Sequence, residues 1–182
     1  MLGLMAAAVA QRWGIDTISI ALKMATQNTT SSATTATGQS TNQLTGLFSV
    51  LPPASDENIS GVKLAIEYMN RIPATERTIA DNFIMSMLQT ALTVIQTKKF
   101  DKDGDGLISP LELLNLDDDS ALDILESIIA AEGALTGVVT GSSGSDSAGD
   151  NISTIRSEID KQEGTTSSEK LRNFLDDEKN SR

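Results

Sequence analysis

The sequence predicts a mostly α-helical protein: a small helical domain built around one acidic loop at residues 101–112, with extended polar linkers and a polar helical tail. Two observations support this fold class. Apolar residues recur at helical spacing in several segments. Apolar residues make up 39% of the 182 residues and aromatic residues only 3%, so the core must be small and aliphatic.

The composition excludes several kinds of chemistry. The chain contains no His and no Cys, which rules out Ser-His-Asp triads, cysteine nucleophiles, Cys/His zinc sites and disulfides. We therefore do not expect an enzyme. The net charge is −11, and residues 92–182 hold nine basic and nineteen acidic side chains. Such a surface repels phosphate backbones, so we expect no nucleic-acid partner; it suits cations, basic partners or simple solubility.

Residues 1–24 form the first predicted unit, an apolar N-terminal segment with a short helix near 13–24. The apolar pattern of this helix consists of Ile15, Ile18 and Leu22, with Ile20, Lys23 and Met24 on the same face. Ala8-Val9-Ala10 resembles a signal-peptidase site, but no basic residue precedes the apolar run. The run is also too short for a membrane span, which takes about 20 residues. We expect it to pack on the chain's own core or on a neighbouring chain.

Residues 25–55 form the second unit, an extended Thr/Ser-rich linker in which no charged residue occurs. Such a tract cannot bury enough apolar surface to order itself. It is therefore either a flexible linker or a segment held by a partner chain.

Residues 56–137 form the helical domain. Asp56 and Glu57 favour a helix start, and Pro73 ends that helix after 72. The apolar residues from Ile79 to Ile95 predict the strongest helix, at 75–97, antiparallel to the first. Further helices are expected at 110–116 and at 119–132, the latter ended by Gly133.

Residues 138–182 form the tail. Residues 141–150 are rich in Gly and Ser and predict a linker. One or two polar helices follow, with sparse apolar residues that can dock on the domain but cannot fold alone.

The acidic loop carries the one chemical motif. Residues 101–112 read Asp-Lys-Asp-Gly-Asp-Gly-Leu-Ile-Ser-Pro-Leu-Glu, the pattern D-x-D-x-D-G-x5-E. Over this loop and its immediate flanks the chain resembles the EF-hand superfamily. The resemblance implies one Ca²⁺ per chain, with these ligands: carboxylates of Asp101, Asp103 and Asp105, the carbonyl of Leu107, Ser109 directly or through water, and both oxygens of Glu112. It also implies a sharp turn at Gly106 and an inward-packing Ile108. The alternative is an acidic turn without a cation, or one that prefers Mg²⁺.

The flanks of the loop depart from the EF-hand pattern. Thr93, Gln96 and Thr97 stand where the entering helix of an EF-hand carries apolar residues. No second loop follows, because Ala121 and Leu122 occupy the positions of the third ligand and the glycine if Asp117 were the first. We interpret Asp117–Asp119 as a helix cap.

A single unpaired loop with irregular flanks favours a calcium-stabilised structural or assembly protein. In this hypothesis Ca²⁺ sets the angle between the 75–97 helix and the 119–132 helix, and other protein subunits are the partners. The uncharged tract and the apolar N-terminus favour a multisubunit particle, such as a virion or an extracellular assembly. The alternative is a calcium sensor or buffer with a transient protein target.

Overall fold

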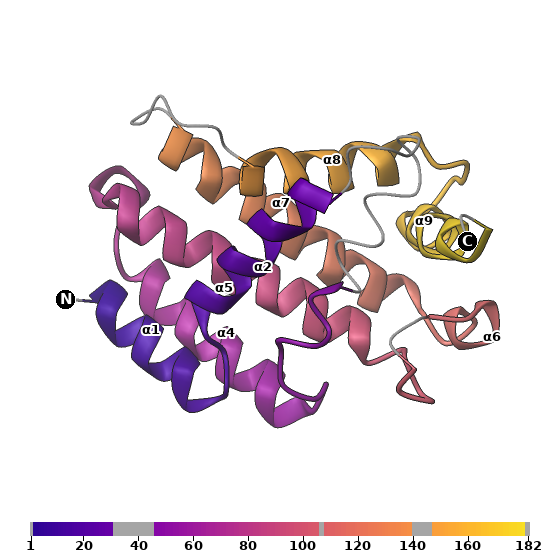
Figure 1. The fold of residues 1–182 in the computed structure, drawn as a ribbon, viewed down its shortest axis with the longest axis horizontal. Coiled ribbons are helices and arrows are strands. Elements are labelled where there is room, and N and C mark those ends of the chain that lie inside the picture. The colour runs from indigo at the N-terminus through magenta and orange to yellow at the C-terminus, as the bar shows by residue number, and fades with distance from the viewer. Residues whose placement is uncertain (1, 31–45, 106–107, 140–146, 181–182) are drawn as a thin grey trace.

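The structure, a computed structural model, describes residues 2–30, 46–105, 108–139 and 147–180. Over these ranges the regular structure is helical, which confirms the predicted fold class (Figure 1). The elements are α1 (Leu2–Arg12), α2 (Thr17–Thr30), α4 (Asp56–Asn70), the 3₁₀ turn η1 (Ala74–Glu76), α5 (Ile79–Lys98), α6 (Pro110–Leu113), α7 (Asp118–Val139), α8 (Ser147–Lys161) and α9 (Ser167–Asn180).

Helix α5 is the centre of the fold, with α4 and α7 packed against it. Every residue from Met85 to Thr97 is buried, so this helix has no solvent face along most of its length. The antiparallel pairing of α4 and α5 through a Pro-containing turn agrees with the sequence analysis. Figure 1 shows α5 crossing the middle of the molecule beneath α2.

The start of α5 differs from the expectation of residue 75. Residues 74–76 form a 3₁₀ turn, and the α-helix begins after Thr78. Asp81 Oδ2 accepts hydrogen bonds from the Thr78 backbone N–H (3.0 Å) and hydroxyl (2.7 Å), and Thr78 Oγ1 accepts from the Asp81 N–H (3.2 Å). This capping box satisfies N–H groups that the first helical turn leaves without partners.

The N-terminal helices also differ from the prediction of one helix near 13–24. A first helix ends at Arg12, Gly14 turns the chain at φ +76°, and Asp16 begins α2 by accepting from the Ile18 N–H (3.0 Å) and the Ser19 hydroxyl (2.7 Å). The predicted apolar face is confirmed only in part: Ile20 is fully buried and Met24 is 3% exposed, whereas Ile18 is 73% exposed. Helix α2 continues to Thr30, inside the stretch expected to be extended. Residues 31–45 lie outside the described part.

Helix α1 packs on the chain's own α4 and α5 through its small residues. Gly3, Ala6 and Ala10 are buried, which allows the helix axes to approach closely. On the outer face of α1, Leu4 is 77% exposed. The sequence left open whether the N-terminal run packs on the chain's own core or on a neighbouring chain, and in the structure it packs on the chain's own core.

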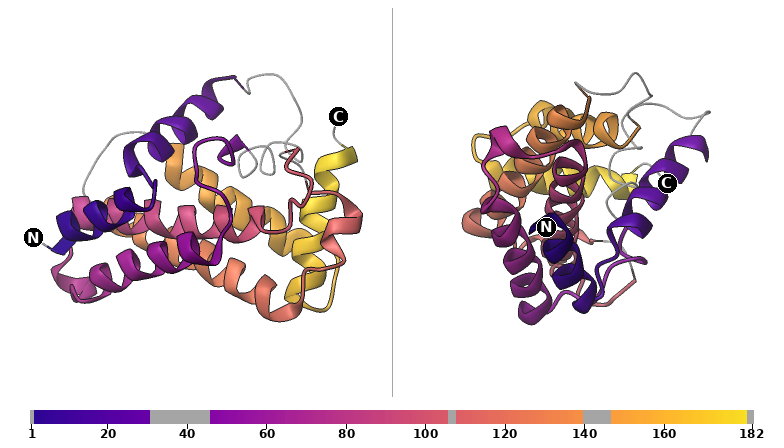
Figure 2. Two further views of the ribbon diagram at one scale, coloured as in Figure 1. Left: turned by 90° about the horizontal axis from the view of Figure 1, so that it is seen from below. Right: turned by 90° about the vertical axis from the view of Figure 1, so that its left-hand side faces the viewer.

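The C-terminal helices dock on α7. This helix runs through Gly133 to Val139 instead of ending at 132, because Gly133 keeps a helical backbone and the next two residues, Ala134 and Leu135, are buried. The two tail helices exist and pack on α7 and on each other. They bury six apolar residues: Ile152, Ile155, Ile159, Leu171, Phe174 and Leu175. Figure 2 shows α9 beside α6, at the end of the molecule that carries the acidic loop.

Candidate metal centre

The acidic loop connects the C-terminal end of α5 to α6 and then to α7. Phe100 before the loop and Ile108 within it are buried, at 7% and 3% exposure, so both ends are fixed in the core. The inward packing predicted for Ile108 is confirmed. Gly106 and Leu107 lie outside the described residues, so the turn assigned to Gly106 and the carbonyl ligand assigned to Leu107 receive no structural account.

Three of the predicted ligands converge. Asp101, Asp103 and Asp105 each place a carboxylate oxygen within 4.8 Å of the other two. The loop backbone supports this arrangement, because Asp101 Oδ1 accepts from the Gly104 N–H (2.8 Å) and Asp103 Oδ1 accepts from the Asp105 N–H (3.1 Å). Gly104 has φ +74°, a conformation that residues with a Cβ rarely adopt. The predicted spacing thus brings three negative groups to one point.

Glu112 lies outside this cluster and binds the loop backbone. Its Oε1 accepts from the N–H of Lys102 (2.6 Å) and of Asp103 (3.3 Å), while its Oε2 accepts from the N–H (2.8 Å) and hydroxyl (2.7 Å) of Ser109. These bonds, those from Ser109 foremost, lower the pKa of Glu112 to about 2. Ser109 and Glu112 are therefore paired with each other, and Glu112 links the first turn of the loop to α6.

The donor set fits a hard divalent cation. Carboxylate, hydroxyl and carbonyl oxygens are the ligands of Ca²⁺ and Mg²⁺, and the site offers no nitrogen or sulfur donor that would favour zinc or copper. The three aspartates are the residues that could hold such an ion. Glu112 lies next to the cluster, because its Oε1 accepts from the backbone N–H groups of Lys102 and Asp103.

The polar residues that break the EF-hand pattern form contacts within the helix pair. The hydroxyl of Thr97 donates to the carbonyl of Thr93 (2.8 Å). The side chain of Gln96 reaches α7, where it accepts from the Ser127 hydroxyl (3.3 Å) and donates to Asp123 Oδ2 (3.5 Å). Gln96 therefore forms polar contacts between α5 and α7, whereas the bond from Thr97 lies within α5.

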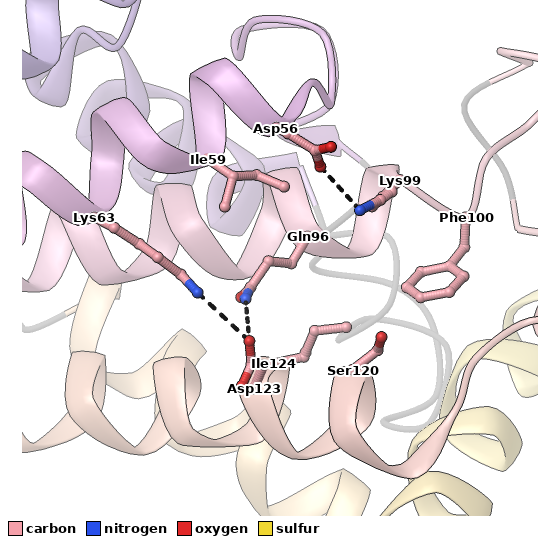
Figure 3. Close-up of a pocket in the computed structure, with 9 residues that line it drawn as sticks. All are labelled: Asp56, Ile59, Lys63, Gln96, Lys99, Phe100, Ser120, Asp123 and Ile124. Atoms are coloured by element: carbon pink, nitrogen blue, oxygen red, sulfur yellow. Dashed lines mark hydrogen bonds and ion pairs between the residues drawn. The ribbon is translucent and has the colours of Figure 1, made fainter.

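A cavity of about 240 Å³ lies behind the loop, between α4, α5 and α7 (Figure 3). Two ion pairs bridge helices at its edge: Lys99 Nζ lies 3.0 Å from Asp56 Oδ1, and Lys63 Nζ lies 3.5 Å from Asp123 Oδ2. Its charged groups are paired, and all four are half-exposed or more, so these bridges contribute little to stability.

The residues after the loop are held by α9, which sequence reasoning did not anticipate. Arg172 donates to the backbone carbonyl of Leu116, and the Ser168 hydroxyl donates to Asp118. No local pattern marks contacts between residues 50 or more positions apart. The interpretation of Asp117 as a helix cap agrees with the structure, because its Oδ1 accepts from the Ser120 N–H (2.7 Å), which lowers the pKa of Asp117.

No protein-family model, curated protein or solved structure matches the chain. Among the described helices, none combines the length and the apolar character that crossing a membrane requires.

Proposed function

We propose that the 101–112 loop binds one Ca²⁺ per chain and acts as a structural clip between α5 and the α6–α7 segment, as an EF-hand loop does. The observation that carries the proposal is the convergence of the carboxylates of Asp101, Asp103 and Asp105 within 4.8 Å. Three like charges at this separation repel one another, and a divalent cation between them replaces repulsion by attraction. Cation binding then stabilises the folded chain by linkage.

The packing around the loop favours a clip over a sensor. A sensor exposes an apolar groove when the entering and exiting helices move apart. Here the entering helix α5 is buried from Met85 to Thr97, so separating it from α7 would open the centre of the core. We infer that Ca²⁺ fixes an arrangement that the rest of the fold already favours.

One feature favours the sensor as a second candidate. Leu111 and Leu114, on and just after α6, are 77% and 74% exposed beside the loop. A calcium-dependent change in this surface would alter the fluorescence of the dye ANS. A gain in ANS fluorescence on adding Ca²⁺ supports a sensor, and an unchanged signal supports the clip.

Assembly with other protein subunits, in a particle such as a virion, is the broader part of the proposal. It is supported by Ile18 and Leu22, one turn apart on α2 and 73% and 64% exposed. Light scattering of the double variant Ile18→Ser/Leu22→Ser tests it. We expect a smaller mass than for the wild type, whereas Leu64→Ser, a partly exposed position on α4, should keep the wild-type mass. A monomeric wild type would refute this part.

The calcium site is tested by calorimetric titration. Asp103→Asn removes one charge of the cluster. Glu112→Gln removes the charge of a proposed ligand and one of the two oxygens that accept from the loop backbone. Each variant should therefore weaken Ca²⁺ binding at least tenfold, which corresponds to about 1.4 kcal/mol. Ser109→Ala should weaken it far less than Glu112→Gln.

Glu126→Gln is the matched control, because it removes the same charge from an exposed position on α7. Its affinity should equal that of the wild type. Equal affinities for all variants would refute the site, and tighter binding of Mg²⁺ than of Ca²⁺ in parallel titrations would change the proposed ion.

A further inference from the structure

The cavity between α4, α5 and α7 combines an apolar wall with a charged rim (Figure 3). Phe100 and Ile124 line it and are buried, at 7% and 1% exposure, and the partly buried Ile59 lines it from α4. Four charged side chains among the described residues also line it, two of each sign: Asp56, Lys63, Lys99 and Asp123. A ligand with a single charge would therefore meet repulsion as well as attraction at this rim.

The polar contacts at one end of the cavity are long. Lys63 Nζ and Gln96 Nε2 each lie 3.5 Å from Asp123 Oδ2, and Figure 3 shows both side chains pointing at this carboxylate. Hydrogen bonds from nitrogen to an ionised carboxylate are normally about 2.7–2.9 Å long. The pair at the other end, Lys99 with Asp56, is 3.0 Å long. Asp123 therefore has two partners but a short bond with neither.

Gln96 is a buried amide whose hydrogen bonds are weak. The residue is 9% exposed. Its carbonyl oxygen accepts from the Ser127 hydroxyl at 3.3 Å, and its amide nitrogen donates to Asp123 at 3.5 Å. Both distances exceed the usual upper values of about 3.0 Å for a hydroxyl donor and about 3.2 Å for an N–H donor. Because an amide both donates and accepts, Gln96 can bind a ligand that carries an acceptor and a donor side by side.

We propose that this cavity binds a small α-amino acid with an apolar side chain. The ammonium of the ligand lies between Asp123 and the carbonyl oxygen of Gln96, and its carboxylate accepts from Lys63 and from the Gln96 amide. The side chain of the ligand packs on the apolar wall. A water molecule occupies about 30 Å³ of liquid, so the cavity of about 240 Å³ accommodates about eight or nine non-hydrogen atoms, the size of L-valine or L-leucine.

The ligand can enter without opening the core. The side chains of Lys63 and Asp123 are 54% and 55% exposed, so their ion pair lies at the mouth of the cavity and stabilises the fold little. A zwitterion replaces this one long pair by two shorter ones and covers the apolar wall, and both changes favour binding. The inference goes beyond the proposed calcium site and does not depend on it, because the three residues that bind the head group lie outside the 101–112 loop.

Calorimetric titration of the full chain with L-valine and L-leucine, up to about 10 mM, tests the proposal. We expect saturable binding, and at least tenfold weaker binding of glycine, which lacks the side chain, and of N-acetyl-L-leucine, which lacks the ammonium. Lys63→Met and Asp123→Asn each remove one charge from the head-group site and should weaken leucine binding at least tenfold. Arg71→Met is the matched control, because it breaks a similarly exposed ion pair with Glu67 on α4 and does not line the cavity. Its affinity for leucine should equal that of the wild type.

Circular dichroism of each variant shows whether it folds. Absence of saturable binding of both amino acids by the wild type would overturn the inference. Equal affinities for L-leucine and N-acetyl-L-leucine would also overturn it, because the ammonium would then play no part. The same holds for equal losses of affinity in Lys63→Met and Arg71→Met. A Gln96→Leu variant that folds and binds leucine as tightly as the wild type would contradict the role of the buried amide and overturn the inference as well.

Discussion

Replacing Gly61 by alanine tests the packing between the N-terminal turn and α4. Gly61 is buried in the middle of α4, and a Cβ built there would lie 2.5 Å from both Cδ1 and Cδ2 of Trp13, and closer still to Cγ. Carbon atoms in contact are about 3.5–4.0 Å apart. The indole ring would therefore have to move by about 1 Å or more. Because Trp13 packs against the core, that movement disturbs its other contacts.

Two opposing effects set the magnitude. Alanine in a helix interior is about 1 kcal/mol more favourable than glycine. Overpacking costs about 1–3 kcal/mol. We expect Gly61→Ala to lower the free energy of unfolding by about 1 kcal/mol, which for a chain of this size lowers Tm by about 2–4 °C.

Gly133→Ala is the matched control. Gly133 also lies within a helix, α7, but nothing lies within 4 Å of a Cβ built there. Only the higher helix propensity of alanine then acts, with no overpacking to oppose it, and the free energy of unfolding should rise by about 0.5–1 kcal/mol. The two variants should differ in Tm by about 3–8 °C, in opposite directions from the wild type.

Thermal unfolding followed by circular dichroism measures these shifts, and the single tryptophan, Trp13, reports its own displacement by a shift in fluorescence emission. The double variant Gly61→Ala/Trp13→Leu should cost less than the sum of its single variants, because the smaller side chain removes the clash. If Gly61→Ala stabilises the chain as much as Gly133→Ala does, the close approach of α4 to Trp13 is wrong.

Three further predictions follow from the caps, the tail and the cation. Thr78→Ala should lower the free energy of unfolding by about 1 kcal/mol, because it removes half of the capping box of α5. Hydrogen bonds from Thr78 lower the pKa of Asp81 below its ordinary 3.8, so the stability that this carboxylate contributes is full above about pH 4 and is lost as the pH falls towards the lowered pKa. Asp81→Asn should remove this part of the acid dependence in denaturant titrations at several pH values. Arg172→Met removes a charged donor from the Leu116 carbonyl and should cost about 1–3 kcal/mol. Arg156→Met breaks ion pairs whose side chains are 34% or more exposed, so it should cost under about 1 kcal/mol in the same denaturation assay; equal costs would contradict the role of α9. Ca²⁺ at 100 times its Kd should add about 2.7 kcal/mol to the free energy of unfolding, and a Tm unaffected by EDTA would show that the loop does not stabilise the fold.

Local patterns in the sequence were sufficient to predict the all-helical fold class, the pairing of α4 with α5 and the position of the acidic loop. The spacing of Asp101, Asp103 and Asp105 alone places three carboxylates on one turn, because a tight loop leaves little freedom to side chains two residues apart. The cap at Asp117 was readable for the same reason: its partner, the Ser120 N–H, is three residues away. The cap at Thr78 was equally local, and the motif Thr-Ile-Ala-Asp at 78–81 contains the signal that would have placed the start of α5.

Tertiary packing decided what local patterns could not. Gly133 did not end α7, because the burial of Ala134 and Leu135 outweighs the weak preference of glycine against a helix interior. The buried face of α2 follows Ile20 and Met24 rather than Ile18 and Leu22, because neighbouring helices determine which apolar face is covered.

The contacts around the loop are of the same kind. Lys98 meets the carbonyl of Phe48 across 50 positions, and Arg172 meets Leu116 across 56. Local sequence patterns show that these side chains are charged, but they do not show which backbone carbonyls the side chains will bind. Their partners are set when α5, α7 and α9 pack together, because burial of apolar area brings distant backbone carbonyls within reach of a lysine or an arginine.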